Sequence, residues 1–306
     1  MNWMNRKRIV ITSLITSLII IGLILYGLAN RYLIEHVEVE VDSSSTASTS
    51  STPAASTSDD WNYQDDQVEI HIQQVQKGSG EDTVTYFVAD VKLTDASYLK
   101  TAFAKNKFGT NIIEPTSTIA AEHQAIFAIN GDYYGFREDG VIIRNGTLYR
   151  DEPARDGLAL YEDGTLQAYN EHEVSSSALL EQGVTNTFSF GPILVNDGVI
   201  ADDLDYVVID TNFGNRSIQS SNPRTGIGMI EPNHYVFVVV DGRMKGYSKG
   251  MTLGEFAQLF TELGCTEAYN LDGGGSSTMY FMGRVVNNPL GKAKERGVSD
   301  VLYIGS

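Results

Sequence analysis

The chain contains almost no cysteine. Cys265 is the single cysteine among 306 residues, which excludes an internal disulfide and a metal site built from several thiolates. It follows Gly264 and precedes a strand-like run, a setting that favours a small buried residue over a nucleophile. Redox chemistry at paired cysteines is therefore excluded.

Histidines are few and far apart in the sequence. No His-x-x-x-His spacing occurs among the five, which are His36, His71, His123, His172 and His234. Three aspartates, Asp132, Asp241 and Asp272, could meet around a divalent cation, but aspartates that end strands are common turn residues. We therefore predict no metal and no cofactor.

Basic residues are scarce outside the N-terminus. All 39 acidic residues lie beyond residue 30, whereas three of the 22 basic residues precede it. The formal charge of the part beyond residue 30 is therefore 19 minus 39, or −20. Such a surface repels nucleic acid at long range. The sequence therefore predicts no nucleic-acid partner.

One long apolar run is present near the N-terminus. Arg6, Lys7 and Arg8 precede residues 9–29, which carry no charge and would span about 31 Å as a helix, enough to cross a hydrocarbon core. A cleaved signal has a shorter apolar region, of about 7 to 15 residues. We predict an uncleaved transmembrane anchor at 9–29, with residues 1–8 cytoplasmic and the C-terminal part extracellular at the cell membrane.

The rest of the chain divides into a linker and one domain. Residues 30–60 include a Ser, Thr and Ala stretch from Asp42 to Asp60 that is too polar to bury, which predicts a flexible tether. From Trp61 to Ser306 the composition is that of a packed protein without a second low-complexity break. We expect one domain at 61–306.

Short apolar runs that end in Asn-Gly or Asp-Gly predict many strands. The alternating segments from Val68 and from Thr83 are typical of an antiparallel hairpin. Thr252 and Glu255 form a capping-box pattern before an amphipathic helix that Gly264 ends, and further helices are expected around 97–107 and 117–124. The fold class is α+β, a mixed, strand-rich sheet domain with a few helices.

The helix after Thr252 joins two apolar runs, "HYVFVVVDG" and "EAYNLDGGG". A strand, helix, strand unit places its two strands parallel or nearly so in one sheet. Ligands of such sheets gather at the carboxyl ends of the strands. Asp241 and Asp272 both stand at such an end.

Three polar stretches each border an apolar strand: "AINGDYYGF" from Ala128, "NPRTGIGM" from Asn222 and "NLDGGGSST" from Asn270. Successive glycine amides can form an anion-binding concavity, to which the Ser276 and Ser277 hydroxyls would add donors. The lysine and following helix of a P-loop are missing. Arg224 suits bidentate contact with phosphate or carboxylate, although a surface salt bridge would also explain it.

Six segments together resemble the phosphodiester glycosidase family. They are "INGDYYG", "NPRTGIG", "VVVDGR", "GMTLGEFAQLFTELG", "NLDGGGSSTM" and "RGVSDVLYIG", in order between Ala125 and Ser306. The resemblance implies hydrolysis of the bond between a sugar's anomeric carbon and a phosphate that is itself esterified. The expected substrates are glycosyl phosphodiesters of cell-surface polymers or exopolysaccharide.

This resemblance assigns roles to the polar residues. Asp272 would stabilise, trap or serve an oxocarbenium-like state, and Arg224 would stabilise the departing phosphate. Asp132 is a weaker candidate for the base, because family members often carry glycine there. Substrate contacts are expected from Asn130, Gly131, Gly273, Gly274, Gly275, Ser276 and Ser277. We expect Arg224 and Asp272 to share one pocket.

Two other functions fit parts of the sequence. "GYSKG" at 246–250 matches the nucleophile pattern of serine hydrolases, but every histidine precedes Ser248, whereas that fold places the catalytic histidine later. The alternative that stays open is a non-catalytic module that binds cell wall or polysaccharide, with Tyr133, Tyr134 and Phe136 as a platform for sugars.

Overall fold

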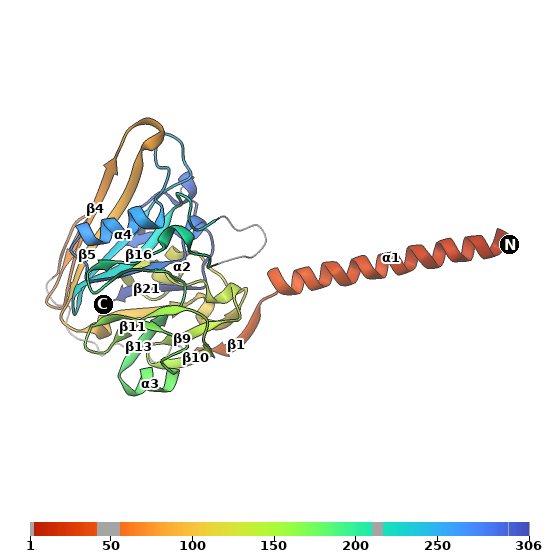
Figure 1. The fold of residues 1–306 in the computed structure, drawn as a ribbon, viewed down its shortest axis with the longest axis horizontal. Coiled ribbons are helices and arrows are strands. Elements are labelled where there is room, and N and C mark those ends of the chain that lie inside the picture. The colour runs from red at the N-terminus through yellow and green to blue at the C-terminus, as the bar shows by residue number, and fades with distance from the viewer. Residues whose placement is uncertain (1–2, 42–55, 210–216, 293, 306) are drawn as a thin grey trace.

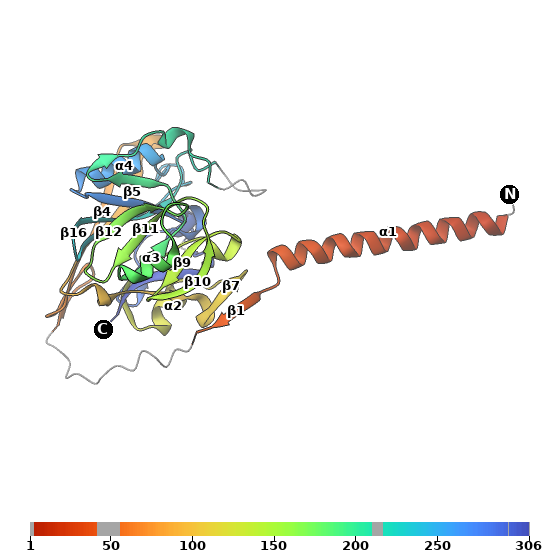
Figure 2. The same cartoon turned by 60° about the horizontal axis from the view of Figure 1, so that its bottom comes forward.

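The computed structural model describes residues 3–41, 56–209, 217–292 and 294–305. Helix α1 (Trp3–Tyr32) projects away from a strand-rich domain (Figure 1; Figure 2). Its segment Val10–Tyr32 has a mean hydropathy of 2.3 and is not buried by the rest of the chain. This length and composition suit a membrane anchor or a signal sequence.

The largest element of the domain is a nine-stranded sheet. In spatial order its strands are β15 (Val199–Ile200), β14 (Ile193–Asn196), β18 (Glu267–Leu271), β16 (Arg224–Glu231), β17 (His234–Val240), β5 (Val84–Leu93), β4 (Val68–Lys77), β3 (Asn62–Gln64) and β2 (Thr57–Ser58). The predicted hairpin is confirmed, since β4 and β5 pair antiparallel from Val68↔Leu93 to Lys77↔Val84.

A five-stranded sheet lies against it. Its order is β20 (Arg284–Val285), β19 (Met279–Phe281), β8 (Ala125–Asn130), β21 (Asp300–Gly305) and β6 (Leu99–Phe103). A three-stranded sheet has the order β12 (Leu166–Asn170), β11 (Asp156–Tyr161) and β13 (Val184–Phe188). Two further pairs are β9 (Gly140–Arg144) with β10 (Thr147–Glu152), and β1 (His36–Glu40) with β7 (Lys107–Thr110).

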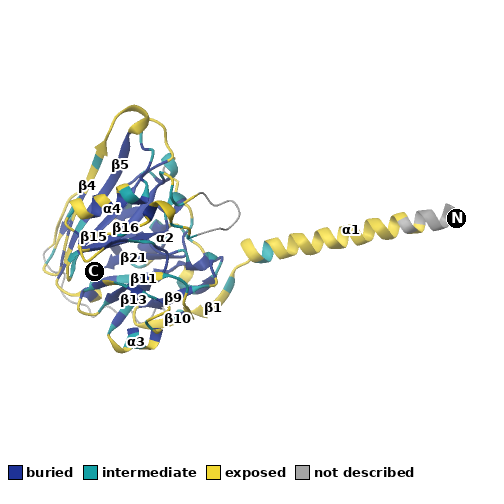
Figure 3. Ribbon diagram, viewed as in Figure 1, coloured by how far each residue is buried: buried dark blue, intermediate teal, exposed yellow. Residues whose placement is uncertain are grey.

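Apolar side chains define the layers of the domain. One core joins the nine-stranded sheet to the other sheets through residues such as Phe237, Phe127 and Leu158. A second core lies between the opposite face of the nine-stranded sheet and α4 (Leu253–Glu262), and a third lies beneath α2 (Thr116–Glu122). Figure 3 shows these strands buried and α1 exposed. The fold is α+β and strand-rich, as predicted.

Helix α4 forms as its sequence predicts. The Thr252 hydroxyl accepts from the Glu255 amide, and the Glu255 carboxylate accepts from the Thr252 amide at 2.8 Å, which completes the capping box. Its Phe256 and Phe260 side chains are buried against the sheet. The strands that this helix joins, β17 and β18, both pair antiparallel with β16 between them, so they run parallel, as expected.

The helix prediction at 97–107 was wrong, whereas α2 confirms the one near 117. Residues 99–103 form β6, which pairs with β21 from Leu99↔Ile304 to Phe103↔Asp300. Lys105 and Asn106 then take left-handed backbone angles, φ 56° and 52°, which a helix does not contain. Sheet pairing with a distant strand overrides the local helix preference here.

Part of the expected linker belongs to the folded domain. Strand β1 (His36–Glu40) pairs with β7, and β2 (Thr57–Ser58) pairs with β3, although both precede residue 61. The stretch 42–55 lies outside the described residues. A short helix α3 (Ser176–Glu181), capped by Ser175, completes the elements that surround the three-stranded sheet.

Close packing of α4 depends on two glycines in β16. A Cβ added to Gly226 would lie 2.8 Å from the Phe256 ring, and one added to Gly228 would lie 2.8 Å from Phe260. Gly226→Ala is therefore expected to lower the free energy of unfolding by about 1–3 kcal/mol, measured by urea denaturation. Gly254→Ala is the control, because nothing lies within 4 Å of its added Cβ. An equal effect of both substitutions would contradict this packing.

Candidate active site

Polar residues converge where three central strands meet. Asn130 ends β8, Arg224 begins β16, and Asp272 follows the end of β18. The Asn130 side chain joins these segments: Nδ2 donates to the Asp272 carbonyl at 2.6 Å, and Oδ1 accepts from Thr225 Oγ1 at 2.7 Å and from the Thr278 amide at 3.2 Å. Asn130 is fully buried, so its amide fixes strand ends.

The next residue must be glycine for steric reasons. A Cβ added to Gly131 would lie 2.4 Å from Oδ1 of Asp300. The Gly131 amide donates to the Asp300 carbonyl at 2.9 Å, and its carbonyl accepts from the Asp272 amide at 3.3 Å. Gly131 therefore lets a buried carboxylate approach the turn that contacts Asp272.

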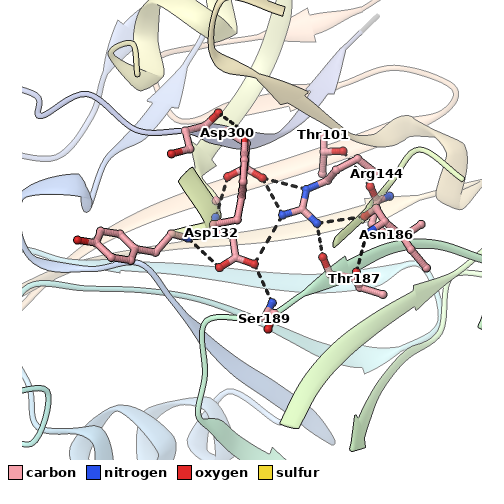
Figure 4. Close-up of polar contacts among 12 residues, drawn as sticks. Thr101, Asp132, Arg144, Asn186, Thr187, Ser189 and Asp300 are labelled. Atoms are coloured by element: carbon pink, nitrogen blue, oxygen red, sulfur yellow. Dashed lines mark hydrogen bonds and ion pairs between the residues drawn. The ribbon is translucent and has the colours of Figure 1, made fainter. Parts of the chain in front are cut away.

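Asp132 belongs to a buried ionic network (Figure 4). Its Oδ2 lies 3.6 Å from Arg144 Nη2 and accepts from the Ser189 amide at 2.7 Å. The Arg144 guanidinium contacts Oδ2 of Asp300 through Nε at 2.9 Å and Nη2 at 2.8 Å. Oδ1 of Asp300 accepts from the Asp132 amide at 2.8 Å. One guanidinium thus contacts two carboxylates, one in the turn after β8 and one at the start of β21.

The network shifts the ionisation of its members. Burial raises the pKa of Asp300 to about 6, although Arg144 opposes the shift. Burial by itself lowers the pKa of Arg144, but Asp300 and Asp132 outweigh it and the net shift is upward. Arg144 was not singled out by the sequence, and Asp300 was part of the quoted C-terminal segment without a role.

Asp272 is a third buried carboxylate near this turn. Its Oδ2 accepts from Ser276 Oγ at 2.6 Å and pairs with Arg296 Nη2 at 3.0 Å. Oδ1 has no hydrogen-bond partner among the described residues. The residue is 7% exposed, and burial raises its pKa, while Arg296, Ser276 and Arg137 lower it. One carboxylate oxygen is therefore held, and the other makes no hydrogen bond within the part of the chain that the structure describes.

The glycine run after Asp272 lies between two arginines. A Cβ on Gly274, where φ is 64°, would lie 3.1 Å from Arg243 Nη2, and one on Gly275 would lie 3.2 Å from Arg296 Cδ. The Gly274 amide donates to the Pro223 carbonyl, and the Ser276 hydroxyl donates to Oδ2 of Asp272. Two of the expected anion-binding donors are therefore already bonded within the protein. Ser277 Oγ is buried without a hydrogen-bond partner among the described residues.

The Arg224 guanidinium binds backbone carbonyls. Nε donates to the Met251 carbonyl at 3.0 Å, and Nη2 donates to the carbonyls of Ser220, at 2.9 Å, and Ile218. Burial lowers the pKa of Arg224 to about 10, with a further contribution from Arg243. Among the described residues no hydrogen bond or ion pair joins Arg224 to Asp272. The guanidinium that pairs with Asp272 is that of Arg296.

Sequence reasoning missed Arg296 because it lies outside the three polar stretches. It opens the quoted segment "RGVSDVLYIG", which supplied the available signal. Its guanidinium donates to Ser276 Oγ and to Oδ2 of Asp272, so one arginine holds both side chains. A loop before β21 thus completes the site.

The C-terminal three-fifths of the chain matches a known family. Residues 123–305 fit the family model of phosphodiester glycosidases. The chain belongs to the phosphodiester glycosidase family. It is 32% identical over 206 residues to the SPbeta prophage-derived uncharacterized protein YomE of Bacillus subtilis (strain 168), covering 64% of this chain and 30% of that protein. The chain thus matches less than a third of the length of this curated relative.

Solved structures share the family fold. The catalytic domain of zebrafish N-acetylglucosamine-1-phosphodiester alpha-N-acetylglucosaminidase, auto-inhibited by its pro-peptide, superposes with a TM-score of 0.61 at 21% identity, covering 83% of this chain and 87% of that one. A hypothetical protein from Synechocystis gives 0.57 at 14% identity, covering 83% and 64%. A putative exported protein from Burkholderia pseudomallei K96243 gives 0.54 at 16%, covering 73% and 74%. These TM-scores establish a common fold.

Ser248, the candidate serine-hydrolase nucleophile, and Asp241, a candidate metal ligand, both make structural contacts. Ser248 is fully buried, where its hydroxyl donates to the Asp241 carbonyl and accepts from the Thr85 amide at 3.0 Å. The Asp241 carboxylate accepts from Asn287 Nδ2 and Tyr247 Oη, both at 2.8 Å. Burial raises the pKa of Asp241. These contacts hold the loops that border β17.

The aromatic platform that the binding-module alternative requires is only partly at the surface. Tyr134 is buried and stacks on Phe108 with ring centroids 5.1 Å apart. Tyr133 and Phe136 stack on each other at 4.8 Å, and the Arg137 guanidinium lies over the Tyr133 ring. Tyr134 therefore belongs to the core.

Ser276 should set the pH dependence of the site. Its hydrogen bond lowers the pKa of Asp272, so Ser276→Ala should raise it. If ionised Asp272 is required, the acidic limb of kcat/KM against pH moves upward by roughly one unit, the size expected for a lost hydrogen bond to a charge. Ser299→Ala is the control, because that buried hydroxyl has no hydrogen-bond partner among the described residues. Coincident profiles for Ser276→Ala and the unaltered protein would contradict this role.

Proposed function

We propose that this protein hydrolyses glycosyl phosphodiesters at the bond between the anomeric carbon and the phosphate, releasing the sugar. The supporting observation is the Asp272 carboxylate, with Oδ2 held by Ser276 and Arg296 and Oδ1 without a partner among the described residues. Arg243 and Arg296 lie beside the glycines that follow it. A carboxylate next to two guanidinium groups suits a substrate that is both sugar and phosphate.

Asp272 carries the chemistry at the sugar. Cleavage on the sugar side of the phosphate develops positive charge at the anomeric carbon, and a carboxylate stabilises that charge, attacks it, or activates water. Burial opposes ionisation of Asp272, while Arg296 and Ser276 favour it. The two contacts on Oδ2 fix the group and leave Oδ1 to face the reacting carbon.

Arginine side chains receive the departing phosphate. A phosphate monoester leaves as a stable anion, so fixed positive charge can replace a strong general acid. Arg296 lies over Gly275 and Arg243 over Gly274. Guanidinium groups bind phosphate oxygens bidentately. We assign the phosphate to this pair of arginines, with Ser277 Oγ as an additional donor.

Neighbouring residues position this machinery. Asn130 and Gly131 bond the backbone of Asp272 at its carbonyl and amide, and Asp132 is held by Arg144 beside Asp300. Arg224 holds the carbonyls of Ile218, Ser220 and Met251, and so supports the segment that leads into β16. Its proposed contribution is indirect.

We infer that the enzyme acts outside the cell on surface polymers or exopolysaccharide. Basic residues precede an apolar segment that is long enough to span a bilayer, which favours a cytoplasmic N-terminus and an external domain. The similar fold of a putative exported protein is consistent with that location.

Asp272→Asn tests the reaction. The amide keeps the shape of the carboxylate but cannot stabilise positive charge, so kcat for release of reducing sugar from a sugar-1-phosphodiester should fall at least about 10³-fold. Asp197→Asn, at an exposed turn, is the control and should retain activity. An unaltered protein that binds glycan but releases no sugar from a panel of such diesters would instead support the binding-module function.

The two arginines should differ in their effects. Arg296→Gln is expected to lower kcat/KM about 10²-fold with little change in melting temperature, since it removes charge beside Asp272. Arg224→Gln is expected to lower the free energy of unfolding by about 1–3 kcal/mol, because it leaves buried carbonyls unpaired. Both quantities are measured for both variants. If Arg224→Gln were fully stable yet inactive, Arg224 would be the phosphate ligand.

A further inference from the structure

The chain that leaves α1 enters the domain at once. Strand β1 begins at His36, four residues after Tyr32, and pairs with β7 from His36↔Thr110 to Glu40↔Lys107. A Cβ added to Gly109 would lie 1.9 Å from the His36 carbonyl oxygen, so β7 is built to accept β1. Four residues reach at most about 14 Å. The domain therefore cannot move far from the end of α1.

Side chains of the domain fix the end of the helix. Asn111 Nδ2 donates at 3.0 Å to the carbonyl of Arg31, in the last turn of α1, where a helix leaves carbonyls without partners. It also donates at 2.9 Å to the carbonyl of Ile34, just beyond the helix. Lys105 pairs with Glu35, and Lys107 with Glu40 at 3.3 Å. We call residues 31–41 the junction segment.

The junction segment packs near one side of the candidate site, and the residues that follow Asn111 contact the other side. Val41 packs on an aromatic cluster that contains Phe108 and Tyr134, two residues after Asp132. The Asn111 amide donates to the Gly135 carbonyl at 2.9 Å in the same turn. On the other side, Glu114 forms a bridge with Val298, and a Cβ on Gly297 would lie 3.0 Å from Ile113. Arg296 directly precedes that contact.

Apolar side chains are exposed around the junction segment. Those on the segment are Leu33, Ile34 and Val37. Ile113, two residues after Asn111, is exposed beside them. They continue the apolar surface of α1 onto the edge of the domain. A bilayer interface would cover such side chains, and a long tether would leave them in water.

We propose that the junction segment holds the domain against the outer surface of the bilayer, so that the enzyme acts on glycosyl phosphodiesters whose alcohol is a membrane lipid. This inference rests on the proposed function and on α1 being an uncleaved anchor. The Ser/Thr stretch connects β1 to β2, two strands of the same domain. It therefore does not separate the domain from the membrane.

Insertion variants test this arrangement in full-length protein reconstituted into vesicles. A flexible Gly/Ser segment of about 20 residues, with a root-mean-square length of roughly 25 Å, is placed after Leu33. The control carries the same segment after Ser50. Two substrates share one sugar 1-phosphate, esterified to a long polyprenol in the vesicle or to methanol in solution.

The unaltered protein and the control should prefer the vesicle-borne diester. The insertion after Leu33 should lower its turnover about tenfold and leave turnover of the methyl diester unchanged. Equal turnover of the vesicle-borne diester by all three proteins would overturn the inference. If the unaltered protein cleaves neither diester, the proposed function fails, and with it the substrate assignment.

Hydrogen exchange tests the docking independently of activity. In vesicles, amides of β1 that donate to β7 should exchange as slowly as those of β7, because they are bonded in the same ladder. Exchange of residues 36–40 at the rate of an unstructured peptide would overturn the docking, whatever the activity.

Discussion

The candidate site depends on one buried ion pair, between Arg144 and Asp300. It places a carboxylate against Gly131, where any side chain would collide with it, and the same carboxylate accepts from the Asp132 amide. The turn that follows β8 is thereby fixed. Because Gly131 and Asn130 bond the backbone of Asp272, the position of the proposed catalytic group follows from charges that lie deeper in the domain.

Such a pair is more important for geometry than for net stability. Moving two charges out of water costs several kcal/mol for each, which their attraction roughly offsets, whereas removal of one partner leaves an unpaired buried charge. Here a single guanidinium faces two carboxylates, and burial together with the nearby Asp132 raises the pKa of Asp300 although Arg144 lowers it. The protein maintains this arrangement through fixed hydrogen bonds from the Ser189 and Asp132 amides.

Local patterns in the sequence were sufficient for elements whose cause is local. Examples are the capping box of α4, the alternating apolar and polar residues of β4 and β5, and the Asn-Gly and Asp-Gly pairs that end short apolar runs. Arg296, Arg144 and Asp300 could not be assigned in that way, since their partners in the site lie between 12 and 168 residues away and the fold of the sheets brings them together. Arg224 shows a different limit of local patterns. Its position at the start of β16 was predicted, but the direction of its side chain was set by carbonyls of a neighbouring loop.

The place of β21 in its sheet has a consequence for how the domain matures. This strand lies between β8 and β6, and it begins with Asp300. A nascent chain that has emerged only as far as β20 therefore lacks both the strand that joins β8 to β6 in the five-stranded sheet and the counter-ion of Arg144. The candidate site is therefore complete only after residues 300–305 have been synthesised and have paired with β8 and β6.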